Sequence, residues 1–410
     1  MNKNLLRNFS WRTIQIFVKQ GVSLLIFGLA FIFLDKNQFG IYSYYLAIAF
    51  FVSMFCDFGI STSVSKYASS FFHTDLIKFK KLAANSLIMV LFPSLLLVSL
   101  LFIFGRYIWQ ENYFYILLLT PLIIFSPVTS VLDGLYRGVK RFKELTKMTT
   151  YSAIFSLPII FFLVREYGLI GALLAQDFFY IILFLVLYRN YDGIEWKVDL
   201  SIIREVGGYA FVFGLAVLGY YLFSRIDIIV LGQYGFFPQI ATYELLNKIF
   251  IVPLTAFSIL GQVIAPDFTE IYSKSEYSKL LESYKKYFII TSIFSIFVAI
   301  VLYLLIPALI QLFIPNYYDE NLTNLIFPCA ILYALQFMAA PINSGIVVST
   351  GYAKLMTYMN LVIGIMNLLL CYIFIEYYGY VGVLYATVIS NYIGYFVLQL
   401  RFYNILKKKI

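Results

Sequence analysis

Four charged side chains stand inside apolar stretches of this sequence, where an ionised group is costly unless it faces a cavity or a partner. Arg225 and Asp227 lie in one stretch, and Glu244 and Lys248 lie in the next. A spacing of four residues puts Glu244 and Lys248 on one face of a helix. A spacing of two, about 200° of helix rotation, puts Arg225 and Asp227 on different faces. The two cations could therefore contact an anionic head group, while the two carboxylates balance them or couple transport to an ion.

An interhelical ion-pair network that fixes the packing of two helices would use the same four residues. The two interpretations stay open and are compatible. Lys19, one or two turns into the first apolar stretch, either faces the same cavity or snorkels to the membrane interface. Asp177 lies inside another apolar stretch, and we expect it to be paired structurally.

Three more charges lie at the expected inner ends of apolar stretches. Asp57 precedes Phe58-Gly59, and Asp133 and Arg137 belong to the run Asp133-Gly134-Leu135-Tyr136-Arg137-Gly138. By bridging to basic loop residues, these charges could form an inner gate. Simple interfacial turns would explain them equally well.

Enzyme chemistry finds little support. The single histidine, His73, lies in a basic loop, and no Gly-x-Ser-x-Gly, His-Glu-x-x-His or Walker A pattern occurs. Cys56, Cys329 and Cys371 have no ligand spacing. We therefore expect no catalytic centre, no metal site and no cofactor. Energy must come from a gradient or from consumption of the product.

The elements that carry these residues are apolar segments of membrane-spanning length. The chain is 62% hydrophobic and 12% charged, a composition typical of proteins dissolved in lipid. About twelve segments approach the ~20 residues that cross a bilayer as a helix. Their continuous apolar runs exclude the alternating strands of a membrane barrel. The expected spans are 14–34, 40–58, 83–105, 113–133, 149–164, 168–188, 207–231, 239–262, 287–308, 322–346, 355–375 and 379–400.

Basic residues alternate between the linkers. One set of linkers, taken with the two chain ends, holds 25 of the 30 Lys and Arg residues, whereas the other set holds only Lys36, Arg106 and Arg165. Because cationic loops are retained in the cytoplasm, this pattern places both termini there. The net charge of +9 then belongs to loops that face anionic lipid, and no nucleic-acid partner is expected.

The sequence also resembles itself. Residues 167–175 match 378–386, with Tyr-Gly followed by Gly three residues later, and residues 39–43 match the region around 241–244. Each copy would hold six spans and insert in the same orientation. We therefore predict an all-α integral membrane protein with two parallel six-helix bundles, residues 1–195 and 196–410, around a central cavity.

On these residues the chain resembles the polysaccharide flippases, in particular the O-antigen flippases, of the multidrug/oligosaccharidyl-lipid/polysaccharide exporter superfamily. The spans match over the whole length. The stretches that carry the resemblance are Phe39-Gly40-Ile41-Tyr42-Ser43; Asp57-Phe58-Gly59 with Ser61 to Ala68; Leu135-Tyr136-Arg137-Gly138 with Arg141-Phe142; and Ser224-Arg225-Ile226-Asp227 with Leu231-Gly232.

The resemblance implies transport of an undecaprenyl-diphosphate-linked oligosaccharide from the cytoplasmic to the outer leaflet of the bacterial cytoplasmic (inner) membrane. The lipid-linked oligosaccharide would cross by alternating access during O-antigen, lipopolysaccharide or other surface-polysaccharide synthesis. Expected partners are this lipid-linked oligosaccharide, membrane lipid, and a polysaccharide polymerase with its chain-length regulator. Arg225, Lys248 and Lys19 would contact the substrate, and Asp227 and Glu244 would balance their charge.

Three other functions remain open. A multidrug antiporter of the same superfamily would need an acidic cavity for organic cations. The lipid-linked peptidoglycan-precursor flippase usually carries two further spans. An oligosaccharide polymerase would be expected to have a large outer loop, and the outer loops expected here are short.

Overall fold

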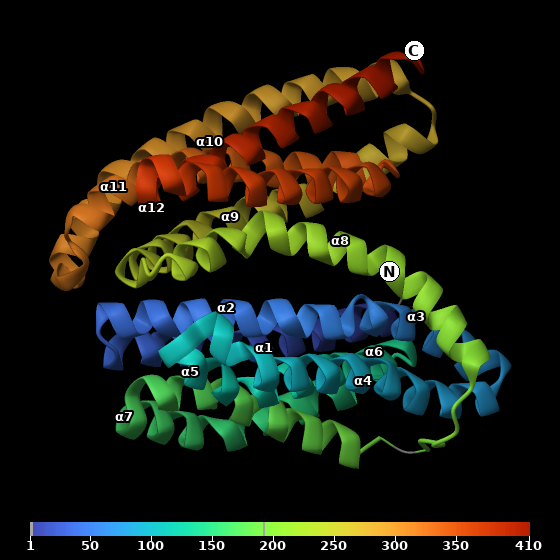
Figure 1. The fold of residues 1–410 in the computed structure, drawn as a ribbon. Helices are drawn as coiled ribbons and strands as arrows, with labels where there is room; N and C mark the ends of the chain where they lie inside the picture. Colours follow the sequence, from blue (N-terminus) through green and yellow to red (C-terminus); the bar gives the residue numbers. More distant parts are fainter. Residues whose placement is uncertain (1–2, 192) are drawn as a thin grey trace. The chain divides into compact units, whose positions relative to one another are not determined.

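The computed structural model describes residues 3–191 and 193–410, and within them the chain is helical with no strand (Figure 1). Single turns of 3-10 helix cover 110–112 and 315–317, and a π-helical turn covers 343–348. The α-helices are α1 (Lys3–Phe33), α2 (Lys36–Asp57), α3 (Ile60–Thr74), α4 (Leu76–Trp109), α5 (Tyr113–Leu118), α6 (Thr120–Gly138), α7 (Phe142–Arg189), α8 (Leu200–Gln233), α9 (Phe237–Ser273), α10 (Tyr277–Phe313), α11 (Glu320–Ile342) and α12 (Ala353–Lys407).

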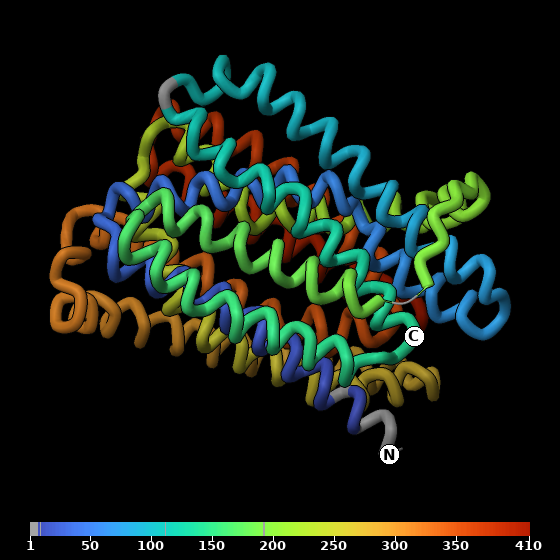
Figure 2. The backbone as a smooth tube through the Cα atoms, turned by 90° about the horizontal axis from the view of Figure 1, so that it is seen from below, coloured from blue at the N-terminus to red at the C-terminus, as the bar shows by residue number. Residues whose placement is uncertain are grey.

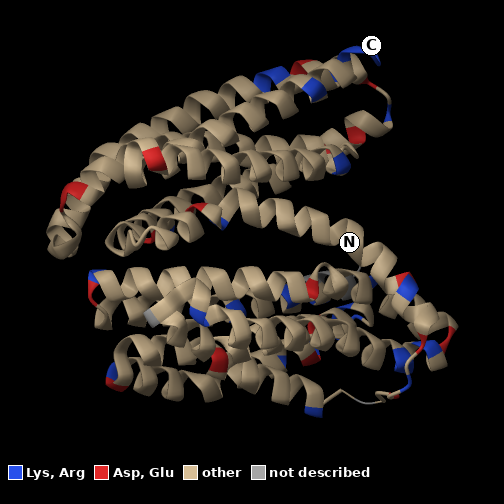
Figure 3. Cartoon of the chain, in the orientation of Figure 1, with Lys and Arg blue, Asp and Glu red and all other residues tan. Residues whose placement is uncertain are grey.

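Ten helical stretches of the described chain are long and apolar enough to cross a membrane, where the sequence predicted about twelve spans. The difference lies in α7 and α12, each of which covers two expected spans. Charged residues are sparse along the helices (Figure 3). Large apolar side chains such as Phe92, Phe155 and Leu304 are exposed instead, as expected for helices solvated by lipid.

Both long helices contain one glycine with a non-helical backbone. Gly168 in α7 has φ 53° and ψ −125°, and Gly379 in α12 has φ 60° and ψ −149°, a region that only glycine adopts readily. A Cβ added at Gly171 or Gly382 would overlap the carbonyl oxygen of the residue eight positions earlier. Eight residues of straight helix would separate such atoms by about 12 Å. The chain therefore turns back on itself at each glycine, as Figure 2 shows for α7.

The repeated sequence thus has a repeated structure. The two Tyr-Gly matches, 167–175 and 378–386, place the turning glycine and the close-contact glycine at the same relative positions. The first glycine supplies the backbone conformation, and the second allows the two helical arms to approach closely. The second predicted match, at 39–43 and 241–244, shows no comparable shared feature and stays a prediction.

The chain forms two compact units, residues 1–218 and 219–410. The division falls inside α8, whereas the boundary expected from the sequence, 195/196, falls in the linker before it. The first part of α8 packs on α3 within the first unit: Ser63 Oγ donates to the Val206 carbonyl at 2.7 Å, and the Lys66 ammonium lies 3.7 Å from the centre of the Tyr209 ring.

A buried amide fastens the linker before α8 to α4. The Asn85 side chain is fully buried; its Nδ2 donates to the Lys197 carbonyl and its Oδ1 accepts from the Asp199 amide, both at 2.9 Å. Ser201 and the ion pair with Lys81 lower the pKa of Asp199. Its ionised carboxylate also accepts from the Ser201 amide at the start of α8. The beginning of α8 is therefore fixed to the first unit.

Small residues bring α3 and α6 together. A Cβ at Gly134 would press on the Ser61 carbonyl, and one at Gly138 on the Ser65 carbonyl. Small residues four apart allow helices to approach closely in membranes. This contact orients the face of α6 that carries Asp133 and Arg137, which are themselves one turn apart.

Candidate functional site

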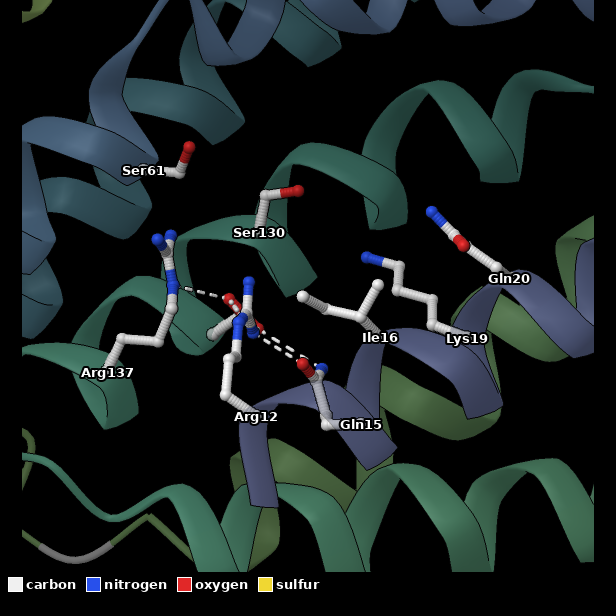
Figure 4. A pocket seen from close by; sticks show the side chains of 9 residues that line it. Arg12, Gln15, Ile16, Lys19, Gln20, Ser61, Ser130 and Arg137 are labelled. Carbon is white, nitrogen blue, oxygen red and sulfur yellow. Dashed lines mark hydrogen bonds and ion pairs between the residues drawn. The ribbon is translucent and has the colours of Figure 1, made fainter. Parts of the chain in front are cut away.

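A polar pocket lies in the first unit among α1, α3 and α6 (Figure 4). Its volume is about 280 Å³, near the lower end of ligand pockets, which span roughly 300–1,000 Å³. It therefore suits a compact head group better than a whole oligosaccharide. The lining residues are Arg12, Gln15, Ile16, Lys19, Gln20, Ser61, Ser130, Asp133 and Arg137.

Two arginines share one carboxylate in this pocket. Arg12 Nη1 lies 3.0 Å from Asp133 Oδ2, and Arg137 Nε lies 2.7 Å from Asp133 Oδ1. Gln15, which is buried, accepts from Arg12 and donates to Asp133 Oδ2 at 3.3 Å. The Gln15 amide also lies 3.4 Å from Thr149 Oγ1 on α7, which orients it.

Positive charge dominates the pocket, since three basic side chains, Arg12, Lys19 and Arg137, surround one acidic group. The Arg137 side chain keeps 27% of its surface exposed, and in Figure 4 its guanidinium points toward Ser61 while the Lys19 ammonium points toward Ser130. Such donors match the oxygens of a phosphate or carboxylate. The pocket can therefore hold an anion.

The structure brings three of the sequence-predicted residues, Lys19, Asp133 and Arg137, into this one site. Asp57 plays a different local part: it accepts from the Ser61 amide at 2.8 Å and from Ser61 Oγ at 2.7 Å, which caps α3. A gating role for Asp57, Asp133 and Arg137 stays a prediction.

Sequence reasoning missed Arg12 and Gln15 because the basic N-terminus was interpreted only as a topology signal. A spacing signal was present. Arg12, Gln15 and Lys19 stand three and four residues apart, which puts them on one helix face. A polar stripe on an otherwise apolar span indicates a face turned away from lipid.

The second unit holds the charges of α8 and α9. Arg225 Nη1 lies 2.6 Å from Glu244 Oε1, with the Arg225 side chain 40% exposed and that of Glu244 6% exposed. Asp227 is buried and accepts from the Ile228 amide at 2.8 Å and from the Tyr243 hydroxyl. The charges of α8 and α9 therefore contact each other through the Arg225–Glu244 ion pair, as an interhelical packing network would. Lys248 lies one turn beyond Glu244, and contact of these residues with a substrate stays a prediction.

We expect Arg225→Ala to lower the stability of the protein by roughly 1–3 kcal/mol, because it leaves the Glu244 carboxylate buried without its cation. The exposed side of the pair keeps the cost below that of a fully buried one. Thermal unfolding of the purified protein in detergent measures the loss. Arg225→Ala combined with Glu244→Gln should recover most of it, and a double variant as unstable as the single one would contradict this account.

Comparisons with known proteins agree with the helical membrane fold. Residues 5–272 match the model of the family described as polysaccharide biosynthesis protein. An uncharacterized membrane protein of Methanocaldococcus jannaschii is 24% identical over 393 residues, which cover 91% of this chain and 91% of that protein.

Solved transporter structures share the fold. An inward-facing multidrug resistance MATE family transporter of the MOP superfamily aligns with a TM-score of 0.73 at 14% identity, covering 97% of this chain and 99% of its own. The lipid II flippase MurJ, in an inward closed conformation, aligns with a TM-score of 0.66 at 17% identity, covering 93% and 86%. A MOP superfamily transporter from Pyrococcus furiosus, described as having a binding pocket of reverse polarity, aligns with a TM-score of 0.58 at 14% identity, covering 99% and 96%.

Proposed function

The chain belongs to the polysaccharide biosynthesis protein family, and from this we propose that it is a flippase for a polyprenyl-diphosphate-linked oligosaccharide. It carries the repeat unit of a surface polysaccharide, such as O-antigen, from the cytoplasmic to the outer leaflet of a bacterial inner membrane. The observation that carries the proposal is the cationic pocket formed by Arg12, Lys19 and Arg137. The fold shared with a lipid II flippase supports it.

The proposed topology has twelve spans. Counting α7 and α12 as two spans each, because each turns back at a glycine, adds two to the ten apolar stretches. An even number puts both termini on one side, and the positive charge of the linkers favours the cytoplasm. The two halves, 1–195 and 196–410, then form parallel bundles that move against each other in alternating access.

The diphosphate of the substrate fits the chemistry of the pocket. A phosphate oxygen offers Arg12 and Arg137 the same charge-assisted hydrogen bonds as Asp133 does. Substrate therefore competes with Asp133 for the two guanidiniums, and the ion pairs close the pocket when it is empty, which gives the inner gate a mechanism. Lys19 adds a third cation. The polyprenyl tail stays in lipid.

The charges of the second unit take a supporting part. Arg225, which keeps 40% of its side chain exposed, and Lys248 contact an anionic group of the substrate during transport. Glu244 and Asp227 balance them, so that the embedded cations do not stand alone in a low-dielectric medium. A polysaccharide polymerase and its chain-length regulator are the partners that receive the product.

A multidrug antiporter is the second candidate, since a MATE family transporter shares the fold. Organic cations need an acidic site. In the described pocket of the first unit, basic groups outnumber acidic ones three to one, which favours an anionic substrate.

Leaflet assignment of lipid-linked oligosaccharide in cells that lack the protein tests the proposal. Accessibility to an external glycan-modifying enzyme reports the leaflet. We expect single repeat units to accumulate on the cytoplasmic side and to be released when the wild-type gene is restored. Units that appear outside but remain unpolymerised would indicate a polymerase. Unchanged lipid-linked sugars would overturn the flippase proposal and direct attention to drug efflux.

A further inference from the structure

Asp177 is a buried carboxyl that the proposed substrate pathway does not use. It lies in the second arm of α7, nine residues after the turning glycine Gly168. Its side chain is buried, with 2% of the residue exposed. Oδ1 accepts a hydrogen bond from the Leu122 amide at 2.9 Å. Oδ2 is fully buried and has no hydrogen-bond partner among the described residues.

The Leu122 amide belongs to a helix that restarts inside the apolar region. α5 ends at Leu118, and Leu119, with φ −92° and ψ 6°, separates it from α6, which begins at Thr120 with Pro121 in its first turn. Leu119, at the N-cap position, makes no side-chain hydrogen bond to the first amides of α6. One of the orphan amides of this new N-terminus is therefore satisfied by Asp177, from a different helix. The carboxyl holds the break between α5 and α6 against α7.

Among the residues that the structure describes, none forms an ion pair with Asp177. Four elements pack against α7: α1, α2, α5 and α6. Several of their charged and phenolic side chains contact other residues. Lys19 lies over the ring of Tyr180 at 5.5 Å, Tyr42 accepts from Gln176 at 3.1 Å, Tyr45 packs against Tyr115, and Arg12, Asp133 and Arg137 pair in the pocket.

Two other buried carboxyl groups, those of Asp227 and Glu244, have partners that stabilise them. Both oxygens of Asp227 accept hydrogen bonds, and Glu244 holds an arginine. Asp177 has one hydrogen bond and no cation in the described structure. The N-terminus of α6 favours negative charge only modestly, whereas an ionised carboxylate with an unsatisfied buried oxygen is strongly penalised. The neutral acid is therefore the form that fits this geometry.

We propose that Asp177 is a proton-binding site that couples movement of the α5–α6 break to proton transfer. The carboxyl is neutral while the break is closed around it. When the break opens and water reaches Oδ2, the O–H bond breaks, the proton passes to a water molecule, and the electron pair stays on the hydrated carboxylate. Closure requires the reverse step. In a flippase, the site links substrate movement to a proton gradient. Only this link rests on the proposed flippase function; the proton site itself does not.

Infrared spectroscopy of the purified full-length protein tests the site without any substrate, because carboxylic acids and carboxylates absorb in separate bands. We expect a carboxylic acid band at neutral pH in the wild type that disappears in Asp177→Asn. That variant keeps an oxygen for the Leu122 amide and should fold. Asp35→Asn is the matched control, because Asp35 is exposed and asparagine preserves the cap that it makes on α2. It should leave the band unchanged.

An Asp177→Asn spectrum identical to that of the wild type would overturn the proton site. Asp177→Leu guards against a folding artefact: it removes the cap as well as the proton, so the band should vanish and the melting temperature should also fall.

In proteoliposomes with lipid-linked oligosaccharide, an imposed proton gradient should accelerate flipping by the wild type at least tenfold and have no effect on Asp177→Asn. If the band is lost but no flipping is seen in the wild type, the proton site stands and the flippase proposal fails. If the wild type flips the oligosaccharide but Asp177→Asn leaves the band unchanged, the flippase proposal stands and the proton site fails.

Discussion

We expect Arg137→Ala to reduce flipping of the proposed substrate, a lipid-linked oligosaccharide, by roughly ten- to a hundredfold. The guanidinium of Arg137 is partly exposed and contacts Asp133 through Nε, so its terminal nitrogens can meet a phosphate. A hydrogen bond to a charged group contributes about 1.5–3 kcal/mol, and each 1.4 kcal/mol is about a tenfold change. The measurement is the rate at which an external glycan-modifying enzyme gains access to the sugar in cells or proteoliposomes.

Two variants separate binding from general damage. Arg137→Lys keeps the charge but loses the planar fork, and it should retain intermediate activity. Arg165→Ala removes an arginine of the same unit whose side chain is 60% exposed and lies near Glu166, and it should flip at the wild-type rate. Full activity of Arg137→Ala, at equal protein level, would remove the pocket from the substrate path.

Gly171→Ala should abolish the folded protein or lower its stability by about 3 kcal/mol or more, at the upper end of what overpacking costs. The added Cβ would overlap the Leu163 carbonyl, and backbone atoms cannot move aside as a flexible side chain can. The two arms of α7 would be forced apart. Yield of monodisperse protein and thermal unfolding in detergent measure the effect, and Gly382→Ala should repeat it in α12 through the Phe374 carbonyl.

Gly28→Ala is the matched control for this prediction. Gly28 lies inside α1, and a Cβ there meets open space. Alanine should therefore be neutral or stabilising by about 0.5–1 kcal/mol, as expected for glycine in a helix interior. Equal stability of Gly171→Ala and Gly28→Ala would show that the reversal in α7 does not depend on the close contact.

Composition and local chemistry predicted much of this fold. Apolar runs of bilayer length give helices directly, because lipid leaves backbone groups no other partner. The glycines of 167–175 and 378–386 were recognised as a repeat, and the structure adds their purpose, since one turns the chain and the other admits the opposite arm. Lys19 was singled out as a charge inside an apolar run, and Asp133 and Arg137 as charges at the end of one.

The pairs of residues that contact each other across the fold could not be predicted in the same way. Asp133 and Arg12 are 121 residues apart, and nothing local to either residue specifies that they meet. The close contact of α3 with α6 sets the position of Asp133, and the packing of α1 on α7 sets that of Arg12. Asp177 likewise depends on a helix restart at Thr120 that a continuous apolar run conceals. Long-range packing decides these pairs, and a single sequence does not display it.

The division of the chain inside α8 matters for anyone who recombines halves of related carriers. A crossover at 195/196, the boundary predicted from the sequence, would graft a foreign segment 200–218 onto α3. It would replace the partners of Ser63 and Lys66, namely Val206 and Tyr209. A crossover at 218/219 keeps those native partners together. Hybrids joined at 218/219, inside α8, should therefore yield more folded protein than hybrids joined at 195/196, in the linker before it. Chimeric proteins are usually joined at linkers, and here the helix is the better place.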